Sequence, residues 1–174
     1  PGIEKVISND LNILRDLAHF VDNHTKFGKI YDFGSVVEEF ERTLKKELDF
    51  TKEGENADTF RDNFSRDRWV KVPEVNWNYT SRRVLTMEFI DGISIDDNKS
   101  LDKAAIDKKE TAQRIAQSIC NQVLRDGFFH ADPHPGNIKV LRDGTIVFLD
   151  LGMVGRISES RKKIISKLFV GMAN

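Results

Sequence analysis

Cysteine is almost absent from this chain of 174 residues, which contains Cys120 alone. A single cysteine excludes an internal disulfide and a zinc site built from several cysteines, and it is typical of a reducing compartment. The sequence also lacks an apolar run of the roughly 20 residues that a membrane-spanning helix needs, and residues 1–5 do not form a signal peptide. We therefore expect a soluble segment, and the lack of an initiator Met predicts a piece of a longer protein.

Charge of one sign is lacking as well. The 27 Lys and Arg residues nearly balance the 28 Asp and Glu residues, which leaves a formal net charge of -1. Such a chain has no overall electrostatic attraction to nucleic-acid phosphates or to an anionic bilayer, so a general nucleic-acid binder is disfavoured. The length suits about one domain, and 39% hydrophobic residues are enough for a core.

Helical spacing of apolar residues dominates the first third of the chain. Over residues 7–21 this spacing predicts an amphipathic helix that begins near residue 3. Ser35 and Glu38 match a capping box, in which each side chain satisfies a free backbone N–H, so we expect the next helix to begin at Ser35. The pattern then continues as one long helix or as two helices that join near Asp49.

The composition and spacing of apolar residues change in the middle of the chain. β-Branched and aromatic residues within residues 69–92 predict two strands, of which residues 84–90 are expected to be the buried one. Helical spacing returns over residues 101–126, and Gly127 is expected to end that helix. Cys120 lies beside the apolar stripe of the helix and is expected to be buried. With a hairpin and a final helix, the pattern is that of a helix-rich α+β protein.

The dipeptide Asp143-Gly144 predicts a β-hairpin with a two-residue turn. In that register Ile138 pairs with Leu149, and Asn137 falls opposite Asp150 where the two antiparallel strands separate. The hairpin is therefore expected to bring an amide oxygen and a carboxylate together at one end.

Asp132 lies in the loop directly before this hairpin, so three oxygen-bearing side chains are expected to converge. Oxygen donors suit Mg²⁺, which proteins commonly hold through one or two carboxylates and substrate phosphates. Asp132, Asn137 and Asp150 also follow the order of a kinase active site, which has a base aspartate, a metal-binding asparagine and a metal-binding aspartate.

Two other interpretations are open for these residues. Asp132 and Asn137 can simply cap turns, with Asp150 ending a strand. Alternatively, His130 and His134 can join the two aspartates in a transition-metal hydrolase site, an interpretation that leaves Asn137 without a role.

The run FHADPHPGN at residues 129–137, followed by DLGMVGR at residues 150–156, closely resembles the UbiB family of atypical kinase-like proteins, also called aarF-domain kinases. The stretches ELDFTKE at residues 47–53 and NADTFRDNF at residues 56–64 are similar to that family's acidic signature, and VLTMEFIDG at residues 84–92 is similar to its hinge. The resemblance covers essentially the whole chain. It implies a protein-kinase-like α+β fold, with an N-lobe remnant (residues 1–92) that holds the glutamate helix and hinge strands, and a helical C-lobe (residues 93–174).

The resemblance implies a role for each matching residue. Asp132 would be the catalytic-loop aspartate, Asn137 and Asp150 the metal ligands, and Glu53 the helix glutamate that pairs with a nucleotide-binding lysine. The other implied positions are an acid pair that contacts a family-specific N-terminal extension (Glu47 and Asp49) and the hinge that meets adenine (Met87, Glu88 and Phe89). Ala131 and Leu151 stand where ordinary kinases carry Arg and Phe.

The residues alone allow simpler interpretations of the upstream stretches. Asp49 and Glu53 are like charges one helical turn apart on what would otherwise be a solvated helix face, and such a pair requires a nearby cation. Met87, Glu88 and Phe89 read as an ordinary strand by composition.

The function implied by the resemblance is that of an ATP-dependent phosphotransferase or ATPase, with ATP or ADP and Mg²⁺ as cofactors. Its implied partners are lipid or quinone intermediates and quinone-biosynthesis proteins. The implied location is the cytoplasmic or matrix side of a bacterial or organelle membrane, with attachment through segments outside this chain. Because a glycine-rich phosphate loop and a strand lysine before the glutamate helix are missing, we expect the segment alone to be inactive. The alternatives are a non-catalytic Mg-nucleotide scaffold and an aminoglycoside- or choline-type phosphotransferase.

Overall fold

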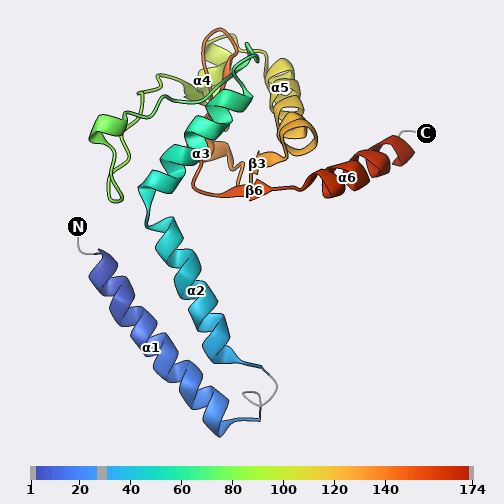
Figure 1. The fold of residues 1–174 in the computed structure, drawn as a ribbon. Coiled ribbons are helices and arrows are strands. Elements are labelled where there is room, and N and C mark those ends of the chain that lie inside the picture. Colours follow the sequence, from blue (N-terminus) through green and yellow to red (C-terminus); the bar gives the residue numbers. More distant parts are fainter. Residues whose placement is uncertain (1–2, 27–30, 173–174) are drawn as a thin grey trace. The chain divides into compact units, whose positions relative to one another are not determined.

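The computed structural model describes residues 3–26 and 31–172, without the side chains of residues 3–5, 45–47 and 168–172. The chain divides into two compact units, Pro1–Asp49 and Phe50–Asn174. Figure 1 shows two long helices in the first unit and a mixture of helices and short strands in the second. The fold is thus α+β and rich in helix, as predicted. The proposed lobe boundary at residues 92 and 93 lies inside the second unit and stays a prediction.

The first unit is a pair of helices, α1 (Ile3–His24) and α2 (Phe33–Glu47), that pack against each other. Leu11 and Ala18, seven residues apart on α1, are buried because this spacing keeps them on one face. The first predicted helix is therefore confirmed, and the second ends close to Asp49 as expected.

The start of α2 differs from the capping box that the sequence predicts. The helix begins at Phe33, and Asp32 takes the capping role, because its Oδ1 accepts the backbone N–H of Ser35 over 3.0 Å. Ser35 thus lies in the first turn, where its hydroxyl also donates to Asp32 at 2.5 Å. These hydrogen bonds from Ser35 lower the pKa of Asp32 below its usual value.

The second unit is built on a four-stranded sheet of order β1-β5-β4-β2 and a two-stranded sheet of β3 and β6. The strands are β1 (Val70–Lys71), β2 (Ile93–Ser94), β3 (Phe128–His130), β4 (Ile138–Val140), β5 (Ile146–Phe148) and β6 (Val154–Arg156). The helices are α3 (Phe50–Asn63), η1 (Trp77–Tyr79), α4 (Asn98–Lys103), α5 (Lys108–Cys120), η2 (Asn121–Asp126), η3 (Pro135–Asn137) and α6 (Glu159–Met172).

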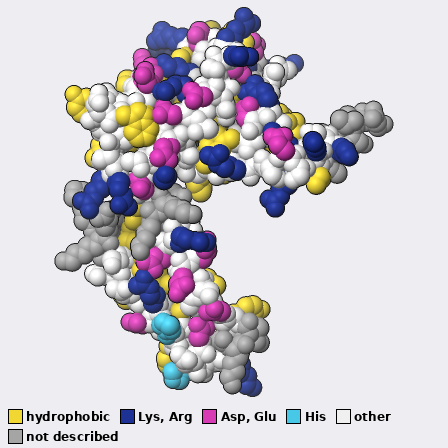
Figure 2. Space-filling model, viewed as in Figure 1, with side chains coloured by type: hydrophobic (Ala, Val, Ile, Leu, Met, Phe, Trp, Pro, Cys, Tyr) yellow, Lys and Arg dark blue, Asp and Glu magenta, His cyan; other side chains and the backbone are white. Residues whose placement is uncertain are grey.

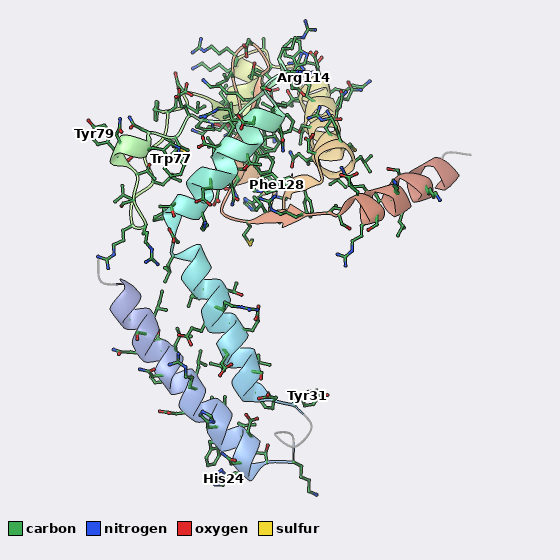
Figure 3. All side chains as sticks on the ribbon, viewed as in Figure 1. His24, Tyr31, Trp77, Tyr79, Arg114 and Phe128 are labelled. Atoms are coloured by element: carbon green, nitrogen blue, oxygen red, sulfur yellow. The ribbon has the colours of Figure 1, made fainter. Side chains whose placement is uncertain are left out.

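The core of the second unit lies between α3 and these strands. Phe60 of α3, Phe148 of β5 and Leu151 are each 0% exposed, and Phe128 of β3 packs on Phe60 with ring centroids 4.8 Å apart. Figure 3 labels Phe128 beside the strands of the two-stranded sheet. Helix α3 supplies Ala57 and Phe60 to this cluster. The position of α3 is therefore set by the same buried residues that pack against β5.

The β4–β5 hairpin has a different register from the predicted one. Ile138 pairs with Phe148 instead of Leu149, which shifts the ladder by one residue. The reason is a longer turn: the N–H of Leu141 donates to Thr145 over 2.9 Å, and Gly144 has φ +81°. A three-residue loop that ends in a left-handed glycine is the next most common hairpin connection after the two-residue turn.

Residues 84–90 do not form the buried strand that the sequence predicts. Within the described residues they make isolated bridges, Ser81 with Val84 and Val75 with Met87. Val84 is 53% exposed and Phe89 is 86% exposed, whereas Ile90 is buried. β-Rich composition fails here because the segment has too few paired neighbours to build a ladder.

The predicted helix over residues 101–126 is divided into α4, α5 and the π-helical turn η2. Gly127 ends it in a left-handed conformation with φ +64°, as expected. Cys120 is exposed, so the prediction that it is buried is wrong. The face turned inward carries Thr111, Ser118 and Gln122, because polar side chains there find hydrogen-bond partners in the backbone.

The surface of the second unit has basic and acidic side chains interspersed on the face shown in Figure 2. This mixture agrees with the balanced composition of the sequence. Over residues 3–26 and 31–172, no helix has both the length and the apolar character needed to cross a bilayer.

Candidate functional site

The end of the β4–β5 hairpin brings Asn137 and Asp150 to neighbouring positions. The backbone N–H of Leu149 donates to the carbonyl of Asn137 over 2.9 Å, so Asn137 lies opposite Leu149 and one residue before Asp150. The predicted direct pairing of Asn137 with Asp150 is wrong by that residue. Both residues nevertheless lie at the end where the two strands separate, since Asn137 ends η3 just before β4 and Asp150 follows β5 by two residues.

The loop that carries Asp132 folds back onto its own backbone. The carbonyl of Asp132 accepts the N–H of His134 over 2.7 Å and lies 3.5 Å from the side-chain nitrogen of Asn137. The Nδ1 of His134 in turn accepts the N–H of Gly136 over 3.1 Å and caps η3. These bonds place Asp132 beside Asn137, and they leave the carboxylate of Asp132 exposed.

His130 lies beneath this loop and is 4% exposed. Its backbone N–H donates to Oε1 of Gln122 over 2.9 Å, and its Nδ1 lies 3.4 Å from both the Met153 carbonyl and the Asp132 nitrogen. Burial lowers the pKa of His130, while the Met153 carbonyl, Asp150 and Asp132 oppose that shift. Both carboxylates therefore lie within electrostatic range of one imidazole.

Asp132, Asn137 and Asp150 fit a hard divalent cation by their chemistry. Among the described residues, neither aspartate takes part in an ion pair, and Oδ1 of Asp150 accepts the N–H of Gly152 over 3.0 Å. Two carboxylates and an amide oxygen are the donors that Mg²⁺ prefers, with water and phosphate oxygens to complete its shell. Bringing these like charges together without a cation would be unfavourable.

A transition-metal site with His130 and His134 finds no support. Within the part of the chain that the structure describes, no three His, Cys, Asp or Glu side chains form a group able to hold a metal ion. His130 faces backbone groups in the interior, and His134 is engaged as the cap of η3.

Glu53 lies in the first turn of α3 and is half-buried. Asp49 precedes that helix by one residue, whereas the side chain of Glu47 lies outside the described residues. Glu53 lies on α3, whose Ala57 and Phe60 share a core cluster with Phe148 of β5 and Leu151, and its role as the helix glutamate stays a prediction. The pairing of Glu53 with a nucleotide-binding lysine also stays a prediction.

Asn56 begins the second stretch that resembles the family's acidic signature, but sequence reasoning gave this residue no role in the site. Its side-chain nitrogen donates to the carbonyl of Leu151 over 2.9 Å and so joins α3 to the segment that follows Asp150. The available signal was a polar side chain placed three residues after Glu53, directly before the buried Ala57. That signal is weak, because periodicity cannot reveal a partner 95 residues away.

The predicted hinge residues form an extended, partly exposed segment. The N–H of Glu88 donates to the carbonyl of Glu74 over 2.8 Å, and its carboxylate pairs with Lys71. This hydrogen bond from Lys71 lowers the pKa of Glu88. A pocket of about 480 Å³ opens beside Met87 and Glu88 and is also lined by Trp77. The structure leaves open space at this segment, and contact with adenine stays a prediction.

The fold itself is kinase-like. The chain superimposes on a solved structure described as the complex of Rv3197 with erythromycin from Mycobacterium tuberculosis, with a TM-score of 0.66 and 23% identity. That match covers 90% of this chain and 38% of the solved one. At this identity the similarity shows the shared fold.

The sequence defines the family within that class. The model of the ABC1 atypical kinase-like domain matches residues 1–174, and the chain therefore belongs to that family. It is 37% identical over 176 residues to the chloroplastic protein ACTIVITY OF BC1 COMPLEX KINASE 8 of Arabidopsis thaliana. It is 36% identical over 171 residues to the probable protein kinase UbiB of Marinobacter nauticus. The predicted resemblance to the UbiB family is confirmed.

The chain spans a quarter to a third of the length of these curated relatives. The match covers 99% of the chain and 23% of the Arabidopsis protein, and 96% of the chain and 31% of the Marinobacter protein.

Proposed function

We propose that this chain is the metal-binding part of an atypical kinase-like protein that binds Mg-ATP and transfers or hydrolyses its terminal phosphoryl group. One observation carries the proposal: Asn137 and Asp150 lie at the same end of the β4–β5 hairpin, beside the loop that carries Asp132. Membership of the ABC1 atypical kinase-like family supports the reaction class.

Asp132 is the proposed catalytic residue, because its exposed carboxylate can accept a hydrogen bond from the attacking hydroxyl or water and orient it. Asn137 and Asp150 are the proposed Mg²⁺ ligands. When bound, Mg²⁺ supplies positive charge that neutralises the phosphate oxygens. The protein's own contribution is to hold these donors in place, since positioning and electrostatics account for most of the catalysis in phosphoryl transfer.

The upstream residues complete the proposed nucleotide site. Glu53 pairs with a lysine from outside this chain, and Met87, Glu88 and Phe89 contact adenine. Glu47 and Asp49 form the acid pair that meets a family-specific extension. Because the sequence has no glycine-rich phosphate loop and no strand lysine before α3, the segment alone is inactive in phosphoryl transfer.

The biological setting belongs to the proposal as well. The resemblance to the UbiB family supports an acceptor or partner in ubiquinone or other isoprenoid-lipid metabolism, at the cytoplasmic or matrix side of a membrane. The chloroplastic relative supports an organelle location for some members. Membrane attachment through segments outside this chain is the part of the proposal that follows from the resemblance to the UbiB family.

The test is a calorimetric titration of the full-length protein with ADP and Mg²⁺. Asp150→Asn is expected to abolish the gain in ADP affinity that Mg²⁺ provides, while Asp132→Asn keeps binding and loses phosphate release. Asp143→Asn, at the turn end of the same hairpin, is the matched control and keeps both.

Identical Mg-ADP binding by the wild type and Asp150→Asn would refute the metal site. Unchanged phosphate release by Asp132→Asn would refute the catalytic role and would leave a nucleotide-binding scaffold.

A further inference from the structure

Asn56 and Asp150 are hydrogen-bonded to the same peptide unit, the one that joins Leu151 to Gly152. The carbonyl of Leu151, which accepts the amide of Asn56, and the N–H of Gly152 belong to the same planar peptide group. That N–H donates to Oδ1 of Asp150 over 3.0 Å. Turning the peptide plane would therefore break both bonds together. Through this plane, an amide on α3 fixes the orientation of the Asp150 carboxylate.

We propose that Asn56 is a positioning residue for the Mg²⁺ ligand Asp150. This inference rests on the metal site proposed above and goes beyond it, because Asn56 itself does not touch the metal or the nucleotide. Removing the amide frees the peptide unit of Leu151 and Gly152 to rotate, so Asp150 loses its fixed hydrogen-bond donor. Partners that orient a metal ligand in this way typically contribute 10- to 100-fold in metal affinity, or about that much in activity.

The packing of Leu151 against α3 is expected to couple the orientation of this peptide plane to the position of the helix. The side chain of Leu151 is 0% exposed and packs in one cluster with Ala57 and Phe60 of that helix. Leu151 is thus held to α3 twice, by its apolar side chain and by its carbonyl. A displacement of α3 is expected to move Leu151 and the orientation of Asp150 with it.

Glu53 shares this helix with Asn56 and lies three residues earlier, on the same face. The residue proposed to pair with the nucleotide-binding lysine and the residue that orients the metal ligand therefore sit one turn apart. The position of α3 consequently couples the phosphate side and the metal side of the site.

A purely structural role for Asn56 is the competing explanation. The carbonyl of the buried Leu151 needs a hydrogen-bond donor for stability alone, whatever binds at Asp150. Both explanations predict that removing the amide lowers stability. They differ in the Mg²⁺ dependence of nucleotide binding, which only a positioning role changes.

The experiment compares Asn56→Leu, which keeps the number of side-chain heavy atoms and removes the donor, with the wild type in the full-length protein. The measurement is the Mg²⁺ concentration that gives half of the gain in ADP affinity, together with ADP affinity in EDTA and the thermal midpoint. We expect that concentration to rise about 10-fold or more, with ADP affinity in EDTA changing by less than about twofold.

Thr59→Val is the matched control, because the hydroxyl of Thr59 bonds within α3, to the carbonyl of Glu55. If Asn56→Leu fails to fold, Asn56→Ala removes the donor with a smaller side chain and is expected to show the same shift. An unchanged Mg²⁺ dependence in a folded Asn56 variant, with only a lower thermal midpoint, would overturn the positioning role.

Asp150→Asn is measured in parallel so that the two proposals can be told apart. If it loses the Mg²⁺ effect while the Asn56 variants keep it, the metal site stands and the positioning role falls. If Asp150→Asn keeps the Mg²⁺ effect, the metal site itself is refuted, and the role of Asn56 with it.

Discussion

The guanidinium of Arg114 donates from Nη1 to the carbonyl of Gly144 over 2.6 Å and so ties α5 to the turn of the β4–β5 hairpin. The same guanidinium stacks on Trp69, with Cζ 3.4 Å from the ring centroid. The carbonyl of Trp69 in turn accepts the N–H of Ile146 at the start of β5. One half-buried cation thus joins a helix, the residue before β1 and the hairpin turn, opposite the end that carries Asn137 and Asp150.

Arg114→Met is expected to lower the free energy of unfolding by about 1–3 kcal/mol, because it removes a charged hydrogen bond to the turn and a cation–π contact. Urea denaturation of the variant and the wild type measures this loss. Lys109→Met, at an exposed position of the same helix, is the control and should change stability by no more than about 0.5 kcal/mol. Equal losses in the two variants would contradict a specific role for Arg114, the position labelled in Figure 3.

The hairpin shows what local sequence can and cannot predict. The dipeptide Asp143-Gly144 correctly located the turn, because glycine is the residue that tolerates φ +81° there. The predicted loop is one residue too short, because the same dipeptide also suits a three-residue loop that ends in a left-handed glycine. Asn137 and Asp150 lie at the same end of the ladder in either register, because the shift is only one residue.

Tertiary partners also explain the other differences. Residues 84–90 have the composition of a strand but lack the paired neighbours that would bury them. Cys120 follows the apolar stripe in sequence, yet the inward face of α5 and η2 is set by polar residues with backbone partners, such as Gln122. The hydrogen bond of Asn56 could not be predicted for the same reason, because only the complete fold brings its partner Leu151 near.

The contact between position 54 and Trp77 can be tested, because Gly54→Ala is expected to change stability in opposite directions with and without the Trp77 side chain. A Cβ on Gly54 would lie 2.8 Å from Trp77, whose indole nitrogen donates to Asp58 over 2.8 Å. Gly54→Ala is therefore expected to destabilise the wild type by displacing the indole. In a Trp77→Ala background it should instead stabilise by about 0.5–1 kcal/mol, because alanine is the better helix former.

A double-mutant cycle by urea denaturation measures the coupling between Gly54 and Trp77. Effects of the same sign and size in both backgrounds would show that Trp77 does not restrict position 54. Figure 3 labels Trp77 on η1, the segment that packs against α3 through this contact.

Asp143 is expected to make stability depend on pH in the acid range. The backbone N–H and then the hydroxyl of Thr145 hold the pKa of Asp143 below its ordinary value, and the N–H lies 2.9 Å from Oδ1. The ionised form is thus favoured in the folded state. Its stabilisation is complete above the unfolded pKa of about 3.9 and is lost as the pH falls through the folded pKa.

The comparison is with Asp143→Asn, which keeps an acceptor for Thr145 but does not titrate. The stability difference between wild type and variant should be constant from pH 5 to 7 and should shift against the wild type below about pH 4. Because Asp143 is exposed, solvent screening keeps the change small, and added salt should reduce it further. A difference that does not vary with pH would contradict the assignment.

Asp22 of α1 caps the beginning of α2 and so connects the two helices of the first unit. Its carboxylate, near the end of α1, accepts the N–H of Phe33 over 3.1 Å and that of Gly34 over 3.0 Å, where α2 begins. These are two of the N–H groups that a helix start leaves without partners inside the helix. Asp22→Ala is therefore expected to destabilise the helix pair by about 1–2 kcal/mol, and Asp22→Asn, which keeps one acceptor oxygen, by less.

Amide hydrogen exchange at Phe33 and Gly34 is the local measurement, because both N–H groups should exchange faster once Asp22 is removed. Asp16→Ala, at an exposed position of α1, is the control and should leave that exchange unchanged. Faster exchange in both variants would mean that the loss of helix charge, and not the cap, is responsible. Protection of Phe33 and Gly34 that persists in Asp22→Ala would show that Asp32 alone is enough to start α2, since its Oδ1 already accepts the N–H of Ser35.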